Sequence, residues 1–430
     1  MPYQYSVSKA YEMMSCFEGI VEYYLVTGDE KYRKMALQFG EAVLNTEVTV
    51  VGSCGCTHEL FDHAKVRQTA PYDGVMQETC VTVTWMKLCV RLLCLTGEAK
   101  YADEIEKSWY NALLGAVNTE KRISDYCRYR FVDELGYPDA VDSFLPFDSY
   151  SPLVPGTRGR QIGGLQVMKD DMTYYGCCAC IAAAGIGLIS RVMLQRGGDG
   201  LYLNLYSAGK VETLAPDGTP LSICMDTTYP ADGTIKLILN TATREDFTLY
   251  LRVPAWSEQN VIMVDGGCTV EWAEKRGYAP IRIPAGNGEQ RITLELDMRV
   301  KCIHPIGVGF GKDELHINVD WANNCIIPSE YIEDPKSRYH IALRRGPLML
   351  GSDARLGYHV DDPVQIAETA DGMAMATLVD TDQIPYPCMI ALAVEKTDGS
   401  SLLLTDYASV GKTWDETSRC AVWLPTPEDA

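Results

Sequence analysis

The chain has 430 residues, 47% hydrophobic and 22% charged, which is typical of a globular protein of two or three domains. Its formal net charge of −20 repels phosphate backbones and anionic lipid, so nucleic acid and membrane surfaces are poor partners. The chain's 16 cysteines do not resemble the framework of a small secreted protein, and they favour reduced thiols in a cytoplasm. The start, MPYQYSVSKAYEMM, lacks the pattern of a secretory signal, so we expect a cytoplasmic location.

Two similar helical hairpins are predicted in the first part of the chain. Residues 8–26, SKAYEMMSCFEGIVEYYLV, have apolar residues at helical spacing, and Gly28 follows before the helix-forming EKYRKMALQFGEAVLNT. The pattern returns 69 residues later, where CLTGEAKYADEIEKSWYNALL places Gly97 between two further helices. Repeated hairpins of this kind stack into toroids or solenoids, because each buries its apolar face against the next.

From about residue 200 the apolar residues recur with a period of two. The segments GLYLNLYSAGKVETL, GTIKLILNTAT, DFTLYLRVPAW and QRITLELDMRV alternate apolar and polar residues, and ALRRGPLMLGS and CMIALAVEK continue the pattern. Short strands at this spacing indicate a β-sandwich. We therefore predict an α+β multidomain protein with a helical domain over residues 1–195 and a β-sandwich region, of two subdomains, over residues 196–430.

The helical part is small for a closed toroid. It has room for about five or six helices, whereas a double toroid needs about twice as many at 1.5 Å per residue. We expect that the chain begins partway through a larger domain, in which case a signal peptide would lie outside the sequence.

Two segments concentrate residues that bind metals. YYGCCACIAAAGIG contains Cys177 and Cys178 at the start of a helix-like run, and QETCVTVTW contains Glu78 and Cys80. Residues two apart converge only in a loop or at a helix entrance, and TAPYDGVMQ supplies a loop before Glu78. One carboxylate and three thiolates suit tetrahedral Zn²⁺. From the spacing alone, thiols packed between helices are the simpler interpretation, and a disulfide between adjacent cysteines would be strained.

The same segments resemble a known family. SKAYEMMSCFEGIVEYYLVTGDEKY, QETCVTVTWMKL, KYADEIEKSWYNALLGA and YYGCCACIAAAGIGL are similar to glycoside hydrolase family 127, the bacterial β-L-arabinofuranosidases, as are the strands FTLYLRVPAW and the tail LLLTDYASVGKTWDETSRCAVWLP. The resemblance implies an (α/α)6 barrel followed by β-sandwich domains. It places residue 1 within the barrel, so that residues 1–195 would be the C-terminal half of a catalytic (α/α)6 barrel.

The resemblance also implies a reaction. Glu78, Cys80, Cys177 and Cys178 would hold zinc, and Cys177 would be the nucleophile of a retaining exo-glycosidase acting on terminal β-L-arabinofuranose or a related plant cell-wall sugar. Zinc would keep the sulfur deprotonated, although a free thiol has a pKa of roughly 8.5. Cys177 would attack the anomeric carbon, where most retaining glycosidases use a carboxylate.

A general acid/base and substrate contacts are implied by the same resemblance. In VVGSCGCTHELFDH, Glu59 matches the acid/base, and Asp62 is the alternative because the loop varies in length. Tyr126, His58 and His63 would contact the substrate. Without the resemblance, Glu59 is by default a solvated loop carboxylate. Tyr126 is equally well an ordinary core or groove aromatic, and His58 and His63 are more simply loop histidines.

Three cysteines depart from the family pattern. Cys180 lies in ACIAAAG, where a proline-containing stretch is usual, and is a competing zinc ligand. Cys54 and Cys56 stand where small residues are expected, and we interpret them as substitutions.

Two other classes of function stay open from the sequence. One is a non-catalytic carbohydrate-binding or structural protein with a structural zinc or no metal. The other is a polysaccharide lyase, which α/α toroids also support. In each case the expected partner is an oligosaccharide or a plant polysaccharide side chain.

Overall fold

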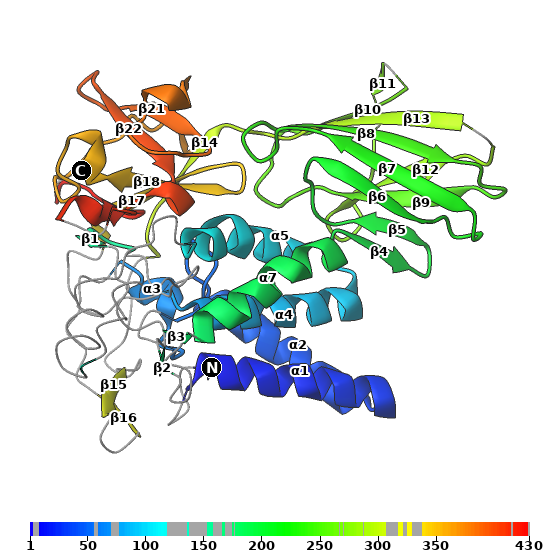
Figure 1. Ribbon diagram of the computed structural model, residues 1–430, viewed down its shortest axis with the longest axis horizontal. Helices are drawn as coiled ribbons and strands as arrows, with labels where there is room; N and C mark the ends of the chain where they lie inside the picture. The colour runs from blue at the N-terminus through cyan, green and yellow to red at the C-terminus, as the bar shows by residue number, and fades with distance from the viewer. Residues whose placement is uncertain are drawn as a thin grey trace.

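Helices form the first part of the chain and β-strands the second in the computed structural model (Figure 1). The change from helix to strand lies between Val192, where the last α-helix of the described residues ends, and Leu194, where a strand begins. The structure describes residues 1–2, 8–55, 59–69, 77–117, 136, 153–157, 166–167, 174–175, 177–265, 267–269, 271–286, 288–306, 317–320, 325–328, 338–413 and 416–428.

The internal repeat predicted from the sequence is confirmed as two helical hairpins. The helices are α1 (Ala10–Thr27), α2 (Glu30–Thr46), α3 (Ala64–Arg67), α4 (Thr79–Thr96), α5 (Lys100–Lys107) with a π-helical continuation (Ser108–Leu113), and α7 (Cys177–Val192). Gly28 and Gly97 end α1 and α4 with φ angles of 69° and 66°. Each donates its N–H to a carbonyl four residues earlier, in a left-handed conformation that glycine adopts without strain.

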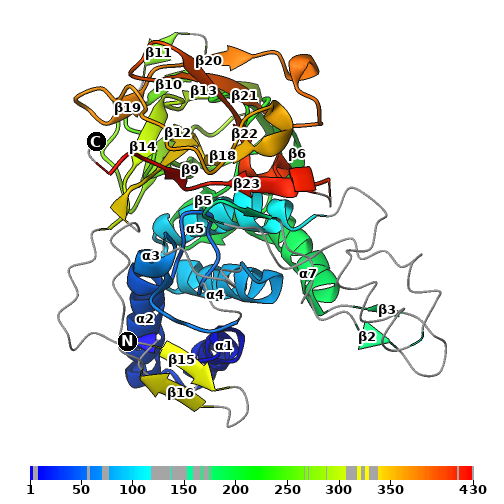
Figure 2. The ribbon, with the colours of Figure 1, turned by 90° about the vertical axis from the view of Figure 1, so that its left-hand side faces the viewer.

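Helix α4 is the centre of the helical part. It packs against α1, α5 and α7, and most of its side chains are buried, including Trp85 and Met86 (Figure 2). A helix that is apolar all round belongs in a core. Among the described helices, α4 alone has the length and apolar composition of a membrane span, and 67% of it is buried inside the protein.

Two sheets of mainly antiparallel strands follow the helices. The six-stranded sheet has the order β11-β10-β13-β8-β7-β6, and the four-stranded sheet has the order β12-β9-β5-β4, in which β5 and β9 are parallel. Strand β8 buries Ile235, Leu237 and Leu239 in the same apolar core as Leu249 and Leu251 of β9, so the sheets share one core. The strands are β4 (Leu194–Gly197), β5 (Gly200–Leu203), β6 (Gly209–Leu214), β7 (Pro220–Asp226), β8 (Thr234–Thr241), β9 (Phe247–Arg252), β10 (Val261–Val264), β11 (Cys268–Thr269), β12 (Tyr278–Ile283) and β13 (Gly288–Glu295).

A further sheet is built mainly from the C-terminal part of the chain. Its main path is β19-β14-β17-β18-β22-β21-β20, and β1 joins it through β23. Its strands are β1 (Gly156–Thr157), β14 (Val300–Ile303), β17 (His340–Arg345), β18 (Leu348–Asp353), β19 (Met373–Ala374), β20 (Ala376–Val379), β21 (Ala391–Glu395), β22 (Ser401–Asp406), β23 (Arg419–Ala421) and β24 (Leu424–Pro425). Two small hairpins pair β2 (Gln166–Val167) with β3 (Tyr174–Tyr175) and β15 (Ile317–Asp320) with β16 (Cys325–Pro328).

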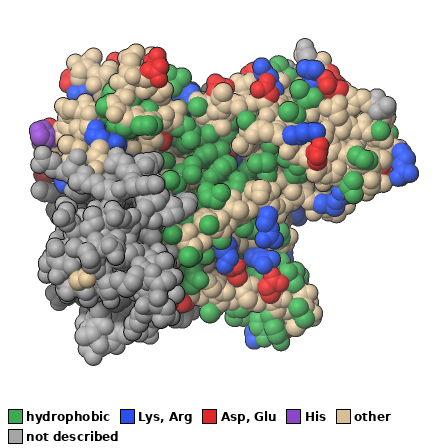
Figure 3. Space-filling view, viewed as in Figure 1, with side chains coloured by type: hydrophobic (Ala, Val, Ile, Leu, Met, Phe, Trp, Pro, Cys, Tyr) green, Lys and Arg blue, Asp and Glu red, His purple; other side chains and the backbone are tan. Residues whose placement is uncertain are grey.

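A buried ionic cluster joins the helices to the sandwich. Arg252, at the end of β9, has no exposed surface and pairs with Asp103 at 2.5 Å and with Glu106, both on α5. Tyr229 donates to Glu106 at 2.6 Å, and Trp256 donates to the other oxygen of Glu106 at 3.3 Å. On the face viewed in Figure 3, hydrophobic side chains gather where helices meet strands. A buried group of paired charges therefore links the two parts.

Substituting Arg252→Met is expected to destabilise the protein strongly. The change leaves Asp103 and Glu106 buried without their cation, which typically costs about 3–5 kcal/mol. Urea unfolding followed by tryptophan fluorescence measures the effect. The matched control is Arg282→Met, because Arg282 is exposed and pairs with the exposed Asp246. An Arg252 variant as stable as the Arg282 variant would contradict this role of the cluster.

Candidate metal centre

Four candidate ligands meet where two helices begin. Glu78 is the extended residue directly before α4, and Cys80 lies in its first turn. Cys177 and Cys178 are the first two residues of α7, which packs against α4. The positive end of each helix dipole favours negative charge at this point. Glu78 and Cys80 converge because the first lies at a helix entrance, as the sequence suggested.

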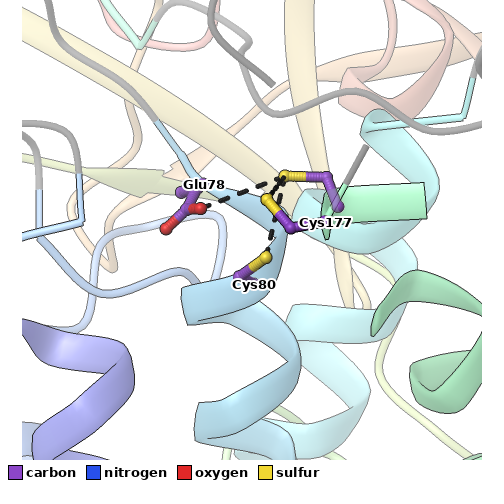
Figure 4. A group of neighbouring side chains, drawn as sticks. Glu78, Cys80 and Cys177 are labelled. Carbon is purple, nitrogen blue, oxygen red and sulfur yellow. Dashed lines mark hydrogen bonds between the residues drawn. The ribbon is translucent and has the colours of Figure 1, made fainter. Parts of the chain in front are cut away.

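The distances between the ligand atoms match a tetrahedral ion site. Cys178 Sγ lies 3.8 Å from Cys80 Sγ, 4.0 Å from Cys177 Sγ and 4.0 Å from Glu78 Oε1, and all four ligand atoms lie within 4.8 Å of one another. Figure 4 shows Glu78, Cys80 and Cys177 pointing toward a common point. Ligand atoms around tetrahedral Zn²⁺ are about 3.5–3.8 Å apart. A small inward movement would therefore complete the site, and none of the three cysteines is in a disulfide.

Glu78 has the features of a metal ligand. Its side chain is buried, and its Oε2 has no hydrogen-bond partner. Burial, with the negative charge of Glu59 nearby, raises the pKa of Glu78 to about 8. A divalent cation bound by the carboxylate would favour its ionised form. The donor set of one carboxylate and three thiols thus fits an ion of intermediate softness.

Cys177 differs from the other two thiols. Cys177 is exposed, whereas Cys178 and Cys80 are buried. Hydrogen bonds from Cys178 and then from Cys80 lower the pKa of Cys177 to about 3, assisted by backbone N–H groups at the start of α7. The same contact with Cys177 raises the pKa of Cys80. Cys177 is therefore the thiol of the group that ionises most readily and the one that a solute can reach.

Glu59 lies against the start of α1. Its carbonyl accepts the N–H of Ala10 at 2.7 Å, and its half-buried carboxylate pairs with Lys9 Nζ at 2.7 Å. This contact raises the pKa of Lys9, so the ammonium group stays charged. The negative charge of Glu59 also raises the pKa of Glu78 by electrostatic repulsion. The sequence did not single out Lys9, because nothing in the sequence pattern relates it to Glu59.

Asp62 and His63 both form contacts within the protein. The Asp62 carboxylate has no exposed surface and pairs with Arg67 at 3.8 Å. Its backbone N–H and those of His63 and Ala64 bind the buried Glu47 carboxylate at 3.0–3.2 Å. His63 is half-buried and precedes α3 with a φ of 61°. The burial of Asp62 makes Glu59 the more accessible carboxylate of this loop.

The other predicted residues lie apart from the group or outside the described residues. Tyr126, His58 and Cys56 lie outside the described residues. Cys180 is exposed and does not belong to the group of four, and Cys54 is buried in the helical core.

Comparison with known proteins identifies relatives of both parts of the chain. The family model described as "Beta-L-arabinofuranosidase, GH127 catalytic domain" matches residues 5–129, and "Beta-L-arabinofuranosidase, GH127 middle domain" matches residues 200–298. The non-reducing end β-L-arabinofuranosidase of Bifidobacterium longum subsp. longum is 23% identical over 376 residues. That alignment covers 85% of this chain and 52% of the relative, so the chain spans about half the length of the curated relative.

Two solved structures share the fold over nearly the whole chain. A GH127 β-arabinofuranosidase superposes with a TM-score of 0.68 at 18% identity, covering 99% of this chain and 61% of that one. A GH127 β-L-arabinofuranosidase from Geobacillus stearothermophilus T6 superposes with a TM-score of 0.65 at 17% identity, covering 98% and 61%. These structures support an α+β multidomain fold.

Replacing one candidate ligand is expected to weaken metal binding. In Cys80→Ser a hydroxyl replaces a thiolate, and zinc affinity should fall by about 100-fold or more, because changes outside the ligand set already cost 10–100-fold. Competition with a chromophoric chelator measures the affinity. Cys89→Ser is the matched control, since Cys89 is also buried on α4 but lies outside the group. Equal affinity in both variants would exclude Cys80 as a ligand.

Proposed function

The chain belongs to glycoside hydrolase family 127, and we propose on this basis that it is a retaining exo-glycoside hydrolase with a zinc-bound cysteine nucleophile. Its substrate would be a terminal β-L-arabinofuranosyl group, or a related plant cell-wall sugar, on an oligosaccharide or polysaccharide side chain. The observation that carries the proposal is the convergence of Glu78, Cys80, Cys177 and Cys178 at two helix entrances.

Zinc is the ion that these residues suit best. Glu78, Cys80, Cys177 and Cys178 would hold it, because three sulfurs and one oxygen favour Zn²⁺ over Mg²⁺ or Ca²⁺. When bound, the ion would keep all three sulfurs deprotonated at neutral pH.

Cys177 is the nucleophile of the proposed reaction. Its exposed Sγ would attack the anomeric carbon as the bond to the leaving oxygen breaks, giving a glycosyl group on the sulfur. Water would then attack the same carbon from the opposite side and return the sulfur to its thiolate form. Two displacements at one carbon retain its configuration.

Glu59 is the proposed general acid and base. In the first displacement it would protonate the leaving oxygen, and in the second it would accept a proton from the attacking water. Its ion pair with Lys9 suits the ionised form that the second step requires. To act in the first step, Glu59 must exchange this contact for the glycosidic oxygen. We propose that Tyr126, His58 and His63 contact the sugar.

We also propose a division of the chain into domains, based on the same family. Residues 1–195 would form part of a catalytic (α/α)6 barrel, and residues 196–430 would form two sandwich subdomains. The repeated hairpins α1–α2 and α4–α5 support the barrel assignment, and the change from helix to strand after Val192 supports the boundary. The net charge of −20 supports a partner that is neither nucleic acid nor membrane.

Substituting Cys177→Ser is expected to abolish hydrolysis. Loss of a catalytic nucleophile lowers kcat by about 10⁴-fold or more, and a chromogenic β-L-arabinofuranoside measures this loss. In the Glu59→Ala variant the glycosyl group should accumulate on Cys177, where mass spectrometry detects it. Cys224→Ser, an exposed cysteine on β7, is the control and should keep its activity. Bound zinc with neither hydrolysis nor adduct would show a structural centre instead.

A further inference from the structure

Cys177 also belongs to a pair of thiols whose other member, Cys180, has no role in the proposed reaction. Cys177 and Cys180 form a Cys-x-x-Cys sequence in the first turn of α7, and both are exposed. Residues three apart lie on the same face of a helix. Their partners in the candidate metal centre, Cys80 and Cys178, are buried. Cys177 therefore borders both groups, because its sulfur lies with the candidate metal centre and Cys180 lies three residues further along the same helix face.

The backbone at this position can accommodate a disulfide. Residues three apart in a helix have Cα atoms about 5 Å apart, which is within the range that disulfides span. The first residue of a helix makes no intrahelical hydrogen bond through its N–H, so it can change its dihedral angles at low cost. Cys177 is that residue in α7. A disulfide would need only a local adjustment there.

We propose that Cys177 and Cys180 are a redox pair that a small-molecule disulfide oxidises to an intramolecular disulfide. Oxidation would withdraw Cys177 from Glu78, Cys80 and Cys178, and would remove both an ion ligand and the nucleophile. The consequence for catalysis rests on the proposed function, whereas the formation of the disulfide does not.

The reaction balances as two thiol–disulfide exchanges. The Cys177 thiolate attacks one sulfur of glutathione disulfide, forms a mixed disulfide and releases one glutathione thiolate. The Cys180 thiolate then attacks the Cys177 sulfur and releases the second glutathione. The two cysteines lose two electrons and two protons, and the small disulfide is reduced to two thiols.

Accessibility favours this pair over the alternatives. The sulfurs of Cys80 and Cys178 are only 3.8 Å apart, but both residues are buried and an oxidant cannot reach them directly. Among the cysteines whose surroundings the structure describes, the other exposed thiols are Cys16, Cys94 and Cys224, and none of these three has a second cysteine within three positions in the sequence.

Peptide mapping after oxidation tests the proposal. The full chain, stripped of metal, is treated with glutathione disulfide, alkylated and fragmented in a mass spectrometer. The expected product is a disulfide that links Cys177 to Cys180 and that dithiothreitol reverses. In Cys180→Ser, the glutathione adduct should instead persist on Cys177. Cys94→Ser is the control for an unrelated exposed thiol, and it should behave as the wild type does.

Two results would overturn the proposal. One is a disulfide that joins Cys80 to Cys178, or Cys178 to Cys180. The other is a lasting glutathione adduct on Cys177 in the wild-type chain.

Zinc affinity supplies a readout independent of hydrolysis. The oxidised wild type should bind zinc at least about 100-fold more weakly than the reduced protein, since it lacks one ligand. Unchanged affinity would show that the disulfide leaves the ion site intact. If the reduced protein neither binds zinc nor cleaves arabinofuranosides, the proposed function fails, and the linkage found by mapping still decides the redox pair.

Discussion

The packing of α4 against α7 brings two helix N-termini to one point, and the candidate metal centre depends on this contact. Glu78 and Cys80 contact Cys178 although they lie 100 and 98 residues from it along the chain. Both helix dipoles favour anions at their N-termini, so the fold supplies part of the stabilisation that thiolates and a carboxylate need. The ligands are also asymmetric. Three are buried, and Cys177 is exposed, so it is the ligand that a solute can reach.

The rest of the structure holds this contact in place. Helix α4 has 18 residues and is about 27 Å long, so its two ends lie in different surroundings. At its far end, Arg276 of the sandwich donates to the Thr96 carbonyl at 2.6 Å, and Ala99 donates to the Arg276 carbonyl at 2.8 Å. The buried Arg252 cluster fixes α5 to the same sandwich. Among the described residues, the sandwich therefore braces the helices from the end opposite the candidate centre and supplies none of the four ligands.

Much of this organisation follows from local sequence pattern. The hairpins around Gly28 and Gly97 could be predicted because a glycine that ends a helix and a repeated apolar spacing are local signals. Strands such as β8 and β13 could be predicted because a half-buried strand alternates along the chain. The resemblance to family 127 is confirmed by the two family models and the curated relative. It named the four residues that the structure brings together, although spacing alone favoured packed thiols.

Pairings between distant side chains could not be predicted in the same way. Arg252 lies 149 residues from Asp103, and no periodicity relates the two. Two further contacts depend on how a loop packs against the ends of helices. They are the Lys9–Glu59 ion pair and the binding of the Glu47 carboxylate to three consecutive backbone N–H groups. The parallel pairing of β5 with β9 also depends on strands that are not neighbours in sequence. Such contacts are decided by tertiary packing, which a single sequence does not encode in a local pattern.

X-ray absorption at the zinc edge, on the reduced and zinc-loaded chain, tests the central claim most directly. The account predicts one zinc with three sulfur neighbours at about 2.3 Å and one oxygen neighbour at about 2.0 Å. A shell of four sulfurs would show that Cys180 has replaced Glu78, and a shell of nitrogen and oxygen alone would show that the cysteines at the starts of α4 and α7 do not bind the ion.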